Sequence, residues 1–429
     1  MTELAEVFLW GGRIGFVSLS DNSSASEFEY DKSFVGAGVE PSPIAMPVNG
    51  RSYSFPELRE ETFHSLPGML ADSLPDKFGS AVLDAWLVSH GRTLDMLSPI
   101  ERLCYLGSRG MGALEYRPAK GITSDLSDTI QVGELFDLAV EVLKVREAGR
   151  AALLPGMKEY GPILKVGASA GGARAKAIIG WKESTGEVRS GQVKLPDGFG
   201  YWLMKFDGVR GNGDKDGEDA KGYGRVEYAY SMMAIAAGIE MSECRLWEGA
   251  HFMTRRFDRT SNGGKIHMQT LGALAHFDYN MPRQYSYEQA FRVLRAIVND
   301  IRAEEELFRR MVFNVFAWNC DDHVKNISFL MDRDGMWRLS PAYDLTYSYN
   351  PGSRWTSGHQ MSIAGKNTGI GISDLMAVSK DVGLKESRAR QIIQEAITAV
   401  ERWSEFAGIA GVDERKMKLI EAKIKQNDY

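Results

Sequence analysis

The residues with the most chemical potential form the run Asn319-Cys-Asp-Asp-His-Val-Lys-Asn326. This run follows residues 308–316, whose apolar side chains have helical spacing. Asp321 and Asn326 have the D-x-x-x-x-N spacing of a phosphotransferase catalytic loop. In that template the aspartate accepts the proton of the substrate hydroxyl, and the asparagine binds Mg²⁺. A purely structural cluster of salt bridges is the alternative interpretation of the same residues.

A short hairpin is expected to bring a third residue to this loop. Residues 327–331 have a strand pattern, Asp332–Gly335 has turn composition, and residues 336–340 return as a strand. Because a hairpin brings its two ends together, Asn326 and Asp344 are expected to lie side by side. An aspartate after a short hairpin is the second Mg²⁺ ligand of the same template. Asp344 therefore strengthens the prediction of a phosphotransferase site.

A lysine stands in an otherwise apolar and aromatic strand, GYWLMKF, at position 205. A buried ammonium needs a partner, and the helical segment that follows offers Glu227. A strand lysine paired with a helix glutamate holds nucleotide phosphates in kinase-like folds. The alternative is a lysine on the exposed face of the strand.

A glycine-rich basic loop occupies positions 167–176, GASAGGARAK, between two predicted strands. Gly171 and Gly172 allow backbone N–H groups to approach an anion, and Arg174 and Lys176 add positive charge. The loop is not a P-loop, because the GK[ST] ending is missing and a strand follows. A plain glycine hairpin explains the loop equally well.

Composition narrows the class of protein around these residues. The 429 residues are 44% hydrophobic and 25% charged, which is typical of a globular protein. The 51 basic and 57 acidic side chains give a net charge of −6, which does not indicate a chain-wide nucleic-acid binder. Cys104, Cys244 and Cys320 are far apart, so neither a CxxC metal knuckle nor a disulfide framework is expected. With neither a signal-peptide pattern nor an apolar run of 18 residues, we expect a cytoplasmic protein without a membrane partner.

Hydrophobic patterns predict an α+β protein with a two-lobed, kinase-like architecture. Strand patterns dominate residues 162–207, whereas helices dominate from about 285 onward, which favours a small β-rich lobe packed on a larger helical lobe. The predicted domains are 1–120, an N-terminal mixed subdomain; 121–258, the β-rich lobe with the glycine-rich loop; and 259–429, the helical catalytic lobe. The individual elements expected are a hairpin at 6–20, helices within 51–116 and at 130–146 and 226–239, and strands at 163–167, 176–181, 200–206, 244–248 and 251–258.

Taken together, these segments resemble the HipA family of serine/threonine kinase toxins, which belong to bacterial type II, HipBA-type toxin–antitoxin modules. The resemblance runs over nearly the whole chain. The motifs that carry it are DSLPDKFG (72–79), GASAGGARAK (167–176), the strand lysine at 205, RRFDR (255–259), DDHVKN (321–326), LSPAYDL (339–345) and HQMSIAGKN (359–367).

The resemblance implies a role for each matching residue. Asp321 would be the catalytic base, and Asn326 and Asp344 would bind Mg²⁺. Ser169 would be autophosphorylated, which expels the glycine-rich loop and switches the kinase off. The residues implied in ATP binding are Gly171, Gly172, Ala173, Arg174, Ala175, Lys176, Lys205, Arg255, Arg256, Phe257, His323, Val324, Lys325, Asn326, Tyr343 and Asp344, of which 255–257 would be the hinge against adenine.

Two positions depart from the family pattern. Members often have Gln-Glu where this chain has Arg174-Ala175, and a glutamate where it has Arg255. Because the expected hinge contacts are mainly backbone contacts, we expect adenine binding to survive the second change. The first change could alter loop closure or substrate docking.

The resemblance also implies partners. The substrate would be a protein, with an aminoacyl-tRNA synthetase such as the glutamyl enzyme as the candidate, and phosphorylating it would arrest growth and favour persistence. A small DNA-binding, HipB-like antitoxin would neutralise the kinase. Operator DNA would be contacted only through that complex, and the basic residues in 385–390 are candidates to assist that contact.

Two other functions remain open. A nucleotide-binding corepressor without kinase activity would keep the ATP site but transfer no phosphate, and the intact Lys205, Asp321, Asn326 and Asp344 count against it. A small-molecule phosphotransferase would share the spacing of Asp321 and Asn326. The N-terminal 120 residues and the serine-containing loop argue against that second alternative.

Overall fold

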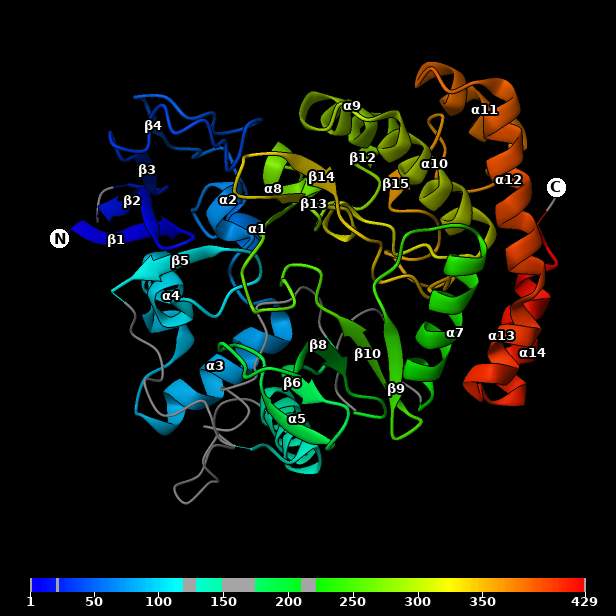
Figure 1. Ribbon diagram of the computed structural model, residues 1–429, viewed down its shortest axis with the longest axis horizontal. Helices are drawn as coiled ribbons and strands as arrows, with labels where there is room; N and C mark the ends of the chain where they lie inside the picture. Colours follow the sequence, from blue (N-terminus) through cyan, green and yellow to red (C-terminus); the bar gives the residue numbers. More distant parts are fainter. Residues whose placement is uncertain (1, 21–22, 119–128, 149–173, 210–220, 428–429) are drawn as a thin grey trace.

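The computed structural model describes residues 2–20, 23–118, 129–148, 174–209 and 221–427. The chain forms three parts (Figure 1): an N-terminal α/β part, a β-rich part with two helices, and a helical C-terminal part. The two ends of the chain lie on opposite sides of the molecule.

The N-terminal part is a five-stranded sheet of order β4-β3-β2-β1-β5 with helices packed on it. The predicted hairpin is confirmed by β1 (Thr2–Leu9) and β2 (Gly12–Ser20), whose turn has Gly11 at φ +85°. The other elements are β3 (Glu27–Tyr30), β4 (Ser52–Tyr53), α1 (Glu60–Phe63), α2 (Gly68–Ala71), α3 (Lys77–Ser89), the 3₁₀ turn η1 (Leu94–Met96), α4 (Pro99–Leu106) and β5 (Leu114–Arg117).

The middle part is an antiparallel sheet of order β7-β6-β8-β10-β9. Its elements are α5 (Val132–Ala148), β6 (Lys176–Lys182), β7 (Glu187–Ser190), β8 (Gly200–Lys205), α7 (Tyr223–Ala236), β9 (Cys244–Trp247) and β10 (His251–Arg255). The strand expected at 163–167 lies outside the described residues, and β7 was not predicted. Helix α3 of the N-terminal part shares a hydrophobic core with α5 and this sheet, so these two parts pack as neighbours.

The C-terminal part consists mainly of helices around one large core, to which α7 also contributes. Its helices are α8 (Leu271–Ala275), α9 (Tyr287–Ile297), α10 (Ile301–Phe316), η3 (Val324–Asn326), α11 (Ile372–Asp381), α12 (Glu386–Glu401), α13 (Trp403–Ala410) and α14 (Glu414–Ile424). Its strands are β11 (His267–Thr270), β12 (Tyr285–Ser286), β13 (Ser328–Met331), β14 (Trp337–Leu339) and β15 (Met361–Ser362).

The predicted hairpin after the polar run is confirmed by β13 and β14, which pair in the antiparallel sense around a turn with Gly335 at φ +79°. Helix α10 ends in ten consecutive buried residues, 307–316, which fix the start of the polar run. The predicted α+β class, a β-rich part against a helical part, is confirmed. In the described ranges, none of the helices is long and apolar enough to cross a membrane.

Candidate functional site

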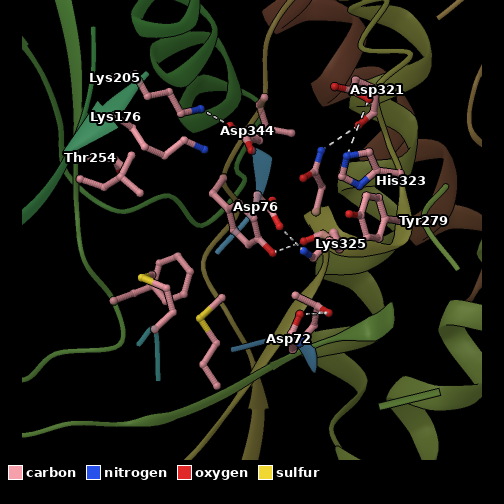
Figure 2. Close-up of a pocket in the computed structure, with 18 of the residues that line it drawn as sticks. Asp72, Asp76, Lys176, Lys205, Thr254, Tyr279, Asp321, His323, Lys325 and Asp344 are labelled. Carbon is pink, nitrogen blue, oxygen red and sulfur yellow. Dashed lines mark hydrogen bonds and ion pairs between the residues drawn. The ribbon is translucent and has the colours of Figure 1, made fainter. Parts of the chain in front are cut away.

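All three parts of the chain contribute to one cleft, which Figure 2 shows in close-up. Most of the residues that the sequence predicts for the site line this cleft, although they come from segments up to 168 positions apart (344 − 176). They are Lys176, Lys205, Glu227, Arg255, Arg256, Phe257, Asp321, His323, Lys325, Asn326, Tyr343 and Asp344.

Lys205 lies between two carboxylates at the end of β8. Its Nζ is 2.6 Å from Oε1 of Glu227 on α7, and it also bonds to Oδ1 of Asp344. Burial alone would lower the pKa of the Lys205 ammonium, but the two carboxylates raise it above its ordinary value. Burial likewise disfavours the charged Asp344 carboxylate, yet Lys205 and Lys176 together hold its pKa below the usual range. The predicted ion pair between Lys205 and Glu227 is therefore present, with Asp344 as a second partner.

Lys176 adds a second cation at the start of β6. It is paired in register with Lys205 across the β6–β8 ladder, and its side chain is 2% exposed. Burial lowers the pKa of Lys176 to about 8, although Asp344 nearby opposes that shift. Two lysines and one aspartate thus converge where Figure 2 shows Lys176, Lys205 and Asp344 pointing toward one another. Such a group suits the phosphates of a nucleotide.

Asp321 stands at the other side of the cleft, just beyond α10. Its Oδ1 accepts a hydrogen bond from Nε2 of Gln360 at 3.1 Å and lies 3.8 Å from Nε2 of His323. Its backbone N–H donates to Oγ of Ser348 at 3.0 Å. The carboxylate is partly exposed, at 26%. It is therefore held in place and still accessible to a substrate hydroxyl, as a general base must be.

Asp322, the next residue, is buried, whereas Asp321 is partly exposed. Its carboxylate accepts hydrogen bonds from the hydroxyl of Tyr287 at 3.0 Å and from the backbone N–H of Gln360 at 2.7 Å, and its Oδ2 lies 2.9 Å from Nδ1 of His359. The side chain is 1% exposed. Asp322 therefore joins the polar run to α9 and to the segment before β15, and it does not line the cleft.

Asn326 and Asp344 fit the donor set that Mg²⁺ prefers, namely amide and carboxylate oxygens. Nδ2 of Asn326 donates to the backbone oxygen of Asp321 at 2.7 Å, which leaves Oδ1 as the side-chain atom able to bind a cation. Asp344 has φ +55°, a strained conformation that is often found at functional sites. No cluster of three His, Cys, Asp or Glu residues that could hold a metal occurs within the described ranges. Mg²⁺ bound mainly by phosphate and water needs only one or two protein ligands.

Tyr343 connects the segments that carry Asn326 and Asp344. Its hydroxyl donates to the backbone oxygen of Lys325 at 2.5 Å and lies 2.5 Å from Oγ of Ser328. Because Tyr343 directly precedes Asp344, this bond ties the far end of the hairpin to the 3₁₀ turn that contains Asn326. The expected proximity of the two hairpin ends is confirmed by this contact.

The expected hinge, 255–257, begins at the last residue of β10. The backbone N–H of Arg256 donates to the oxygen of Tyr201 at 2.9 Å, and its buried guanidinium forms an ion pair with Asp258 at 2.6 Å. The ring of Phe257 lies 5.6 Å from that of Tyr343. Arg255 directs its guanidinium to Glu243, 3.3 Å away, and its side chain is 48% exposed. The side chain that departs from the family pattern is thus engaged in a surface ion pair.

Some of the predicted ATP-binding residues do not line this cleft. Val324 is 2% exposed and packs in the hydrophobic core of the C-terminal part. Ala175 is fully buried, and the guanidinium of Arg174 lies over the ring of Tyr223, 4.3 Å from its centroid. Ser169, Gly171, Gly172 and Ala173 lie outside the described residues, so their roles stay predictions.

The structure also adds residues that the sequence analysis did not assign to the site. From the N-terminal part come Asp72, Asp76 and Met111, and from the C-terminal part Met268 and Tyr279. The motif DSLPDKFG was noted for its family resemblance, but nothing local in it indicates that its aspartates reach a cleft formed by residues 200 positions later. The methionines and Phe252, Leu203 and Leu345 supply an apolar wall suited to a base.

The cleft therefore lies between a β-rich and a helical part, with a strand lysine, a helix glutamate and an aspartate after a hairpin. These features define a protein with a kinase-like fold. The HipA N-terminal domain model matches residues 5–117, and the HipA-like C-terminal domain model matches residues 168–404. Since the second model alone matches more than half of the chain, the protein belongs to the HipA family.

Comparison with solved structures supports the same fold. The chain is similar to HipA of the Shewanella oneidensis MR-1 toxin–antitoxin system, solved with HipB and its operator DNA. The TM-score is 0.68 at 17% identity, covering 99% of this chain and 97% of that one. At this identity the likeness shows the fold alone.

Two curated proteins are similar in sequence. One is "Putative kinase" of Haemophilus influenzae, 30% identical over 101 residues, or 22% of this chain and 29% of that protein. The other is "Putative kinase Y4dM" of Sinorhizobium fredii, 26% identical over 227 residues, or 48% of this chain and 51% of that protein. The chain thus spans about half the length, or less, of these curated relatives.

Proposed function

We propose that this protein is a Mg·ATP-dependent serine/threonine protein kinase that acts as a growth-arresting toxin. The observation that supports the proposal is that Lys205, Asp321, Asn326 and Asp344 all line one cleft, and that they follow one another in the sequence in the order of a phosphotransferase site. The names of the curated relatives and the fold shared with Shewanella HipA support the same reading.

In this proposal each side chain has one task. Lys176 and Lys205 neutralise the phosphates of ATP, while the apolar wall and segment 255–257 hold adenine. Asp321 accepts the proton of the attacking serine or threonine hydroxyl as the bond to the γ-phosphorus forms and the bond to the β,γ-bridging oxygen breaks. Asn326 and Asp344 would hold Mg²⁺, which would neutralise charge on the phosphates.

The finer parts of the proposal come from the family. Autophosphorylation at Ser169 would switch the kinase off. A HipB-like antitoxin would neutralise it, as the Shewanella complex of HipA, HipB and operator DNA suggests, and this chain would reach operator DNA only through that partner. The substrate would be a cytoplasmic protein, with an aminoacyl-tRNA synthetase as the first candidate.

Controlled expression in a bacterial host tests the toxin function. Wild-type protein is expected to arrest growth and to add phosphate to serine or threonine of a host protein, and the Asp321→Ala variant is expected to do neither at equal abundance. Growth arrest by both variants would contradict a kinase toxin and favour the corepressor. Phosphorylation of small alcohols without any protein target would favour the small-molecule phosphotransferase.

A further inference from the structure

The turn between α2 and α3 in the N-terminal part contacts the C-terminal part. It carries Asp72 and Asp76, both of which line the cleft. The two carboxylate oxygens of Asp72 accept hydrogen bonds from the backbone N–H and the hydroxyl of Thr270, at 2.8 and 2.9 Å. Thr270 in turn caps α8, because its Oγ1 accepts the N–H of Ala273 at 3.1 Å. Asp72 thus fixes the start of α8 from another domain.

Asp76 makes the second contact, and it reaches the catalytic segment itself. Its Oδ1 lies 2.7 Å from Nζ of Lys325, and the two side chains are only 12% and 16% exposed. The same ammonium lies 4.6 Å from the ring centroid of Tyr279. Figure 2 shows Asp76, Lys325 and Tyr279 grouped at one side of the cleft, below Asp321 and His323. The ion pair joins residues 249 positions apart.

The position of Asp76 on its own helix supports a role outside that helix. It is the N-cap residue of α3, where an aspartate normally accepts a hydrogen bond from the first turn of the helix. The Asp76 side chain makes no such bond. Burial would lower the pKa of the Lys325 ammonium, but Asp76 and neighbouring groups raise it above its ordinary value, so Lys325 stays charged.

Lys325 is held at both ends. Its side chain binds Asp76, and its backbone oxygen accepts the hydroxyl of Tyr343. The next residue, Asn326, donates to the backbone oxygen of Asp321. Because these contacts are consecutive, a shift of Lys325 would move the base and the metal ligand together.

We propose that Asp76 is a positioning residue for phosphoryl transfer: its ion pair with Lys325 fixes the loop that carries Asp321 and Asn326. Docking of the N-terminal domain is then a condition for catalysis and not only for stability. The catalytic part of this inference rests on the proposed function, whereas the structural part does not.

A matched control exists elsewhere in the same interface. Glu115 on β5 and Lys265 form another ion pair between the two domains, with 2.9 Å between Oε1 and Nζ and about one-fifth exposure on each side. Neither residue lines the cleft. Loss of this pair should weaken domain docking without changing a contact of the catalytic segment.

The test compares Asp76→Asn, Asp76→Glu and Glu115→Gln with wild-type protein. Three readouts are needed: kcat and KM for ATP, the unfolding temperature, and hydrogen–deuterium exchange of residues 319–327 without nucleotide. Because a displacement of about 1 Å can cost about a hundredfold in rate, we expect Asp76→Asn to lower kcat by about 10- to 100-fold. The KM for ATP should stay within about threefold, and exchange in 319–327 should rise. Asp76→Glu should recover part of kcat, and Glu115→Gln should change neither kcat nor that exchange while lowering the unfolding temperature.

Two results would overturn the inference: wild-type kcat in Asp76→Asn, or an equal loss of kcat in Glu115→Gln. If wild-type protein transfers no phosphate, hydrogen–deuterium exchange alone tests whether Asp76 positions the loop. Faster exchange of 319–327 in Asp76→Asn but not in Glu115→Gln would keep the positioning role while the proposed kinase function fails. Equal exchange in all variants would remove the positioning role.

Discussion

Lys176 and Lys205 have identical side chains, but their positions shift their pKa values in opposite directions. Lys205 has two carboxylate partners, whereas Lys176 is buried beside another cation and shares Asp344 with it. Like charges opposite each other in a ladder repel, and burial disfavours the charged form. Lys205 therefore stays charged, while Lys176 loses its proton at about pH 8.

The lowered pKa of Lys176 predicts that ATP binding depends on pH. Its pKa of about 8 means that the ammonium is charged below pH 8 and loses its charge above it. Only the charged form attracts phosphate, so the KM for ATP should rise between pH 7.5 and 9.5, by up to about tenfold per pH unit above the pKa. Lys176→Arg should show a flatter profile, because arginine stays charged. Parallel profiles of KM against pH in the two proteins would contradict this assignment.

Asp322 holds several elements together beside the site through hydrogen bonds. The sequence motif alone does not distinguish this residue from Asp321. Helix α9 provides Tyr287, and the segment before β15 provides His359 and Gln360. Tyr287 also accepts a hydrogen bond from Asn314 of α10 at 2.9 Å. Four segments that are separate in sequence are thus held around one buried carboxylate.

Replacing Asp322 should therefore cost stability. Asp322→Ala leaves the Tyr287 hydroxyl and the Gln360 N–H without their acceptor in a buried site, and such losses cost about 3–5 kcal/mol. Urea unfolding followed by circular dichroism measures this change. Asp321→Ala is the control, because it removes a partly exposed carboxylate and should alter the free energy of unfolding by less than about 1 kcal/mol. Equal destabilisation by both changes would contradict the structural role of Asp322.

Local patterns in the sequence were sufficient to predict those elements whose contacts are close in the chain. The hairpin after Asn326 and the buried end of α10 are of this kind. The pair of Lys205 and Glu227 was predictable from the need of a buried ammonium for a partner on the following helix. The contacts of Asp72 and Asp76 were not predictable, because their partners lie about 200 and 249 positions away in the sequence. Val324 was placed among the ATP-binding residues because it stands inside the motif, yet its apolar side chain packs in the core.

In the whole molecule, two histidines of the C-terminal part contact the N-terminal part: His267, which is buried, and His276, which is partly buried. Nε2 of His267 lies 2.9 Å from the backbone oxygen of Pro41, and Nε2 of His276 accepts the N–H of Gly68 at 3.0 Å. Burial lowers the pKa of each histidine to about 4. Both are therefore neutral in the folded protein near neutral pH.

These histidines predict that acid weakens the folded protein. In the unfolded chain they bind protons near pH 6.5, whereas in the folded protein they do so only near pH 4. Stability is therefore complete above pH 6.5 and falls as the pH drops toward 4, by up to about 3 kcal/mol for each histidine. Chemical unfolding at pH 7, 6 and 5 measures the slope. His276→Gln keeps an acceptor for Gly68 without titrating and should reduce that slope; an unchanged slope would contradict the role of His276.

The central claim is that the cleft transfers the γ-phosphate of ATP. The most direct test is mass spectrometry of the purified protein after incubation with Mg·ATP, beside Asp321→Ala treated identically. We expect phosphate on Ser169 in the wild-type protein and none in the variant. Phosphate on a different serine or threonine would retain the kinase and contradict the role of Ser169. No phosphate in either protein, with ATP still bound, would contradict the kinase and leave the corepressor as the better account.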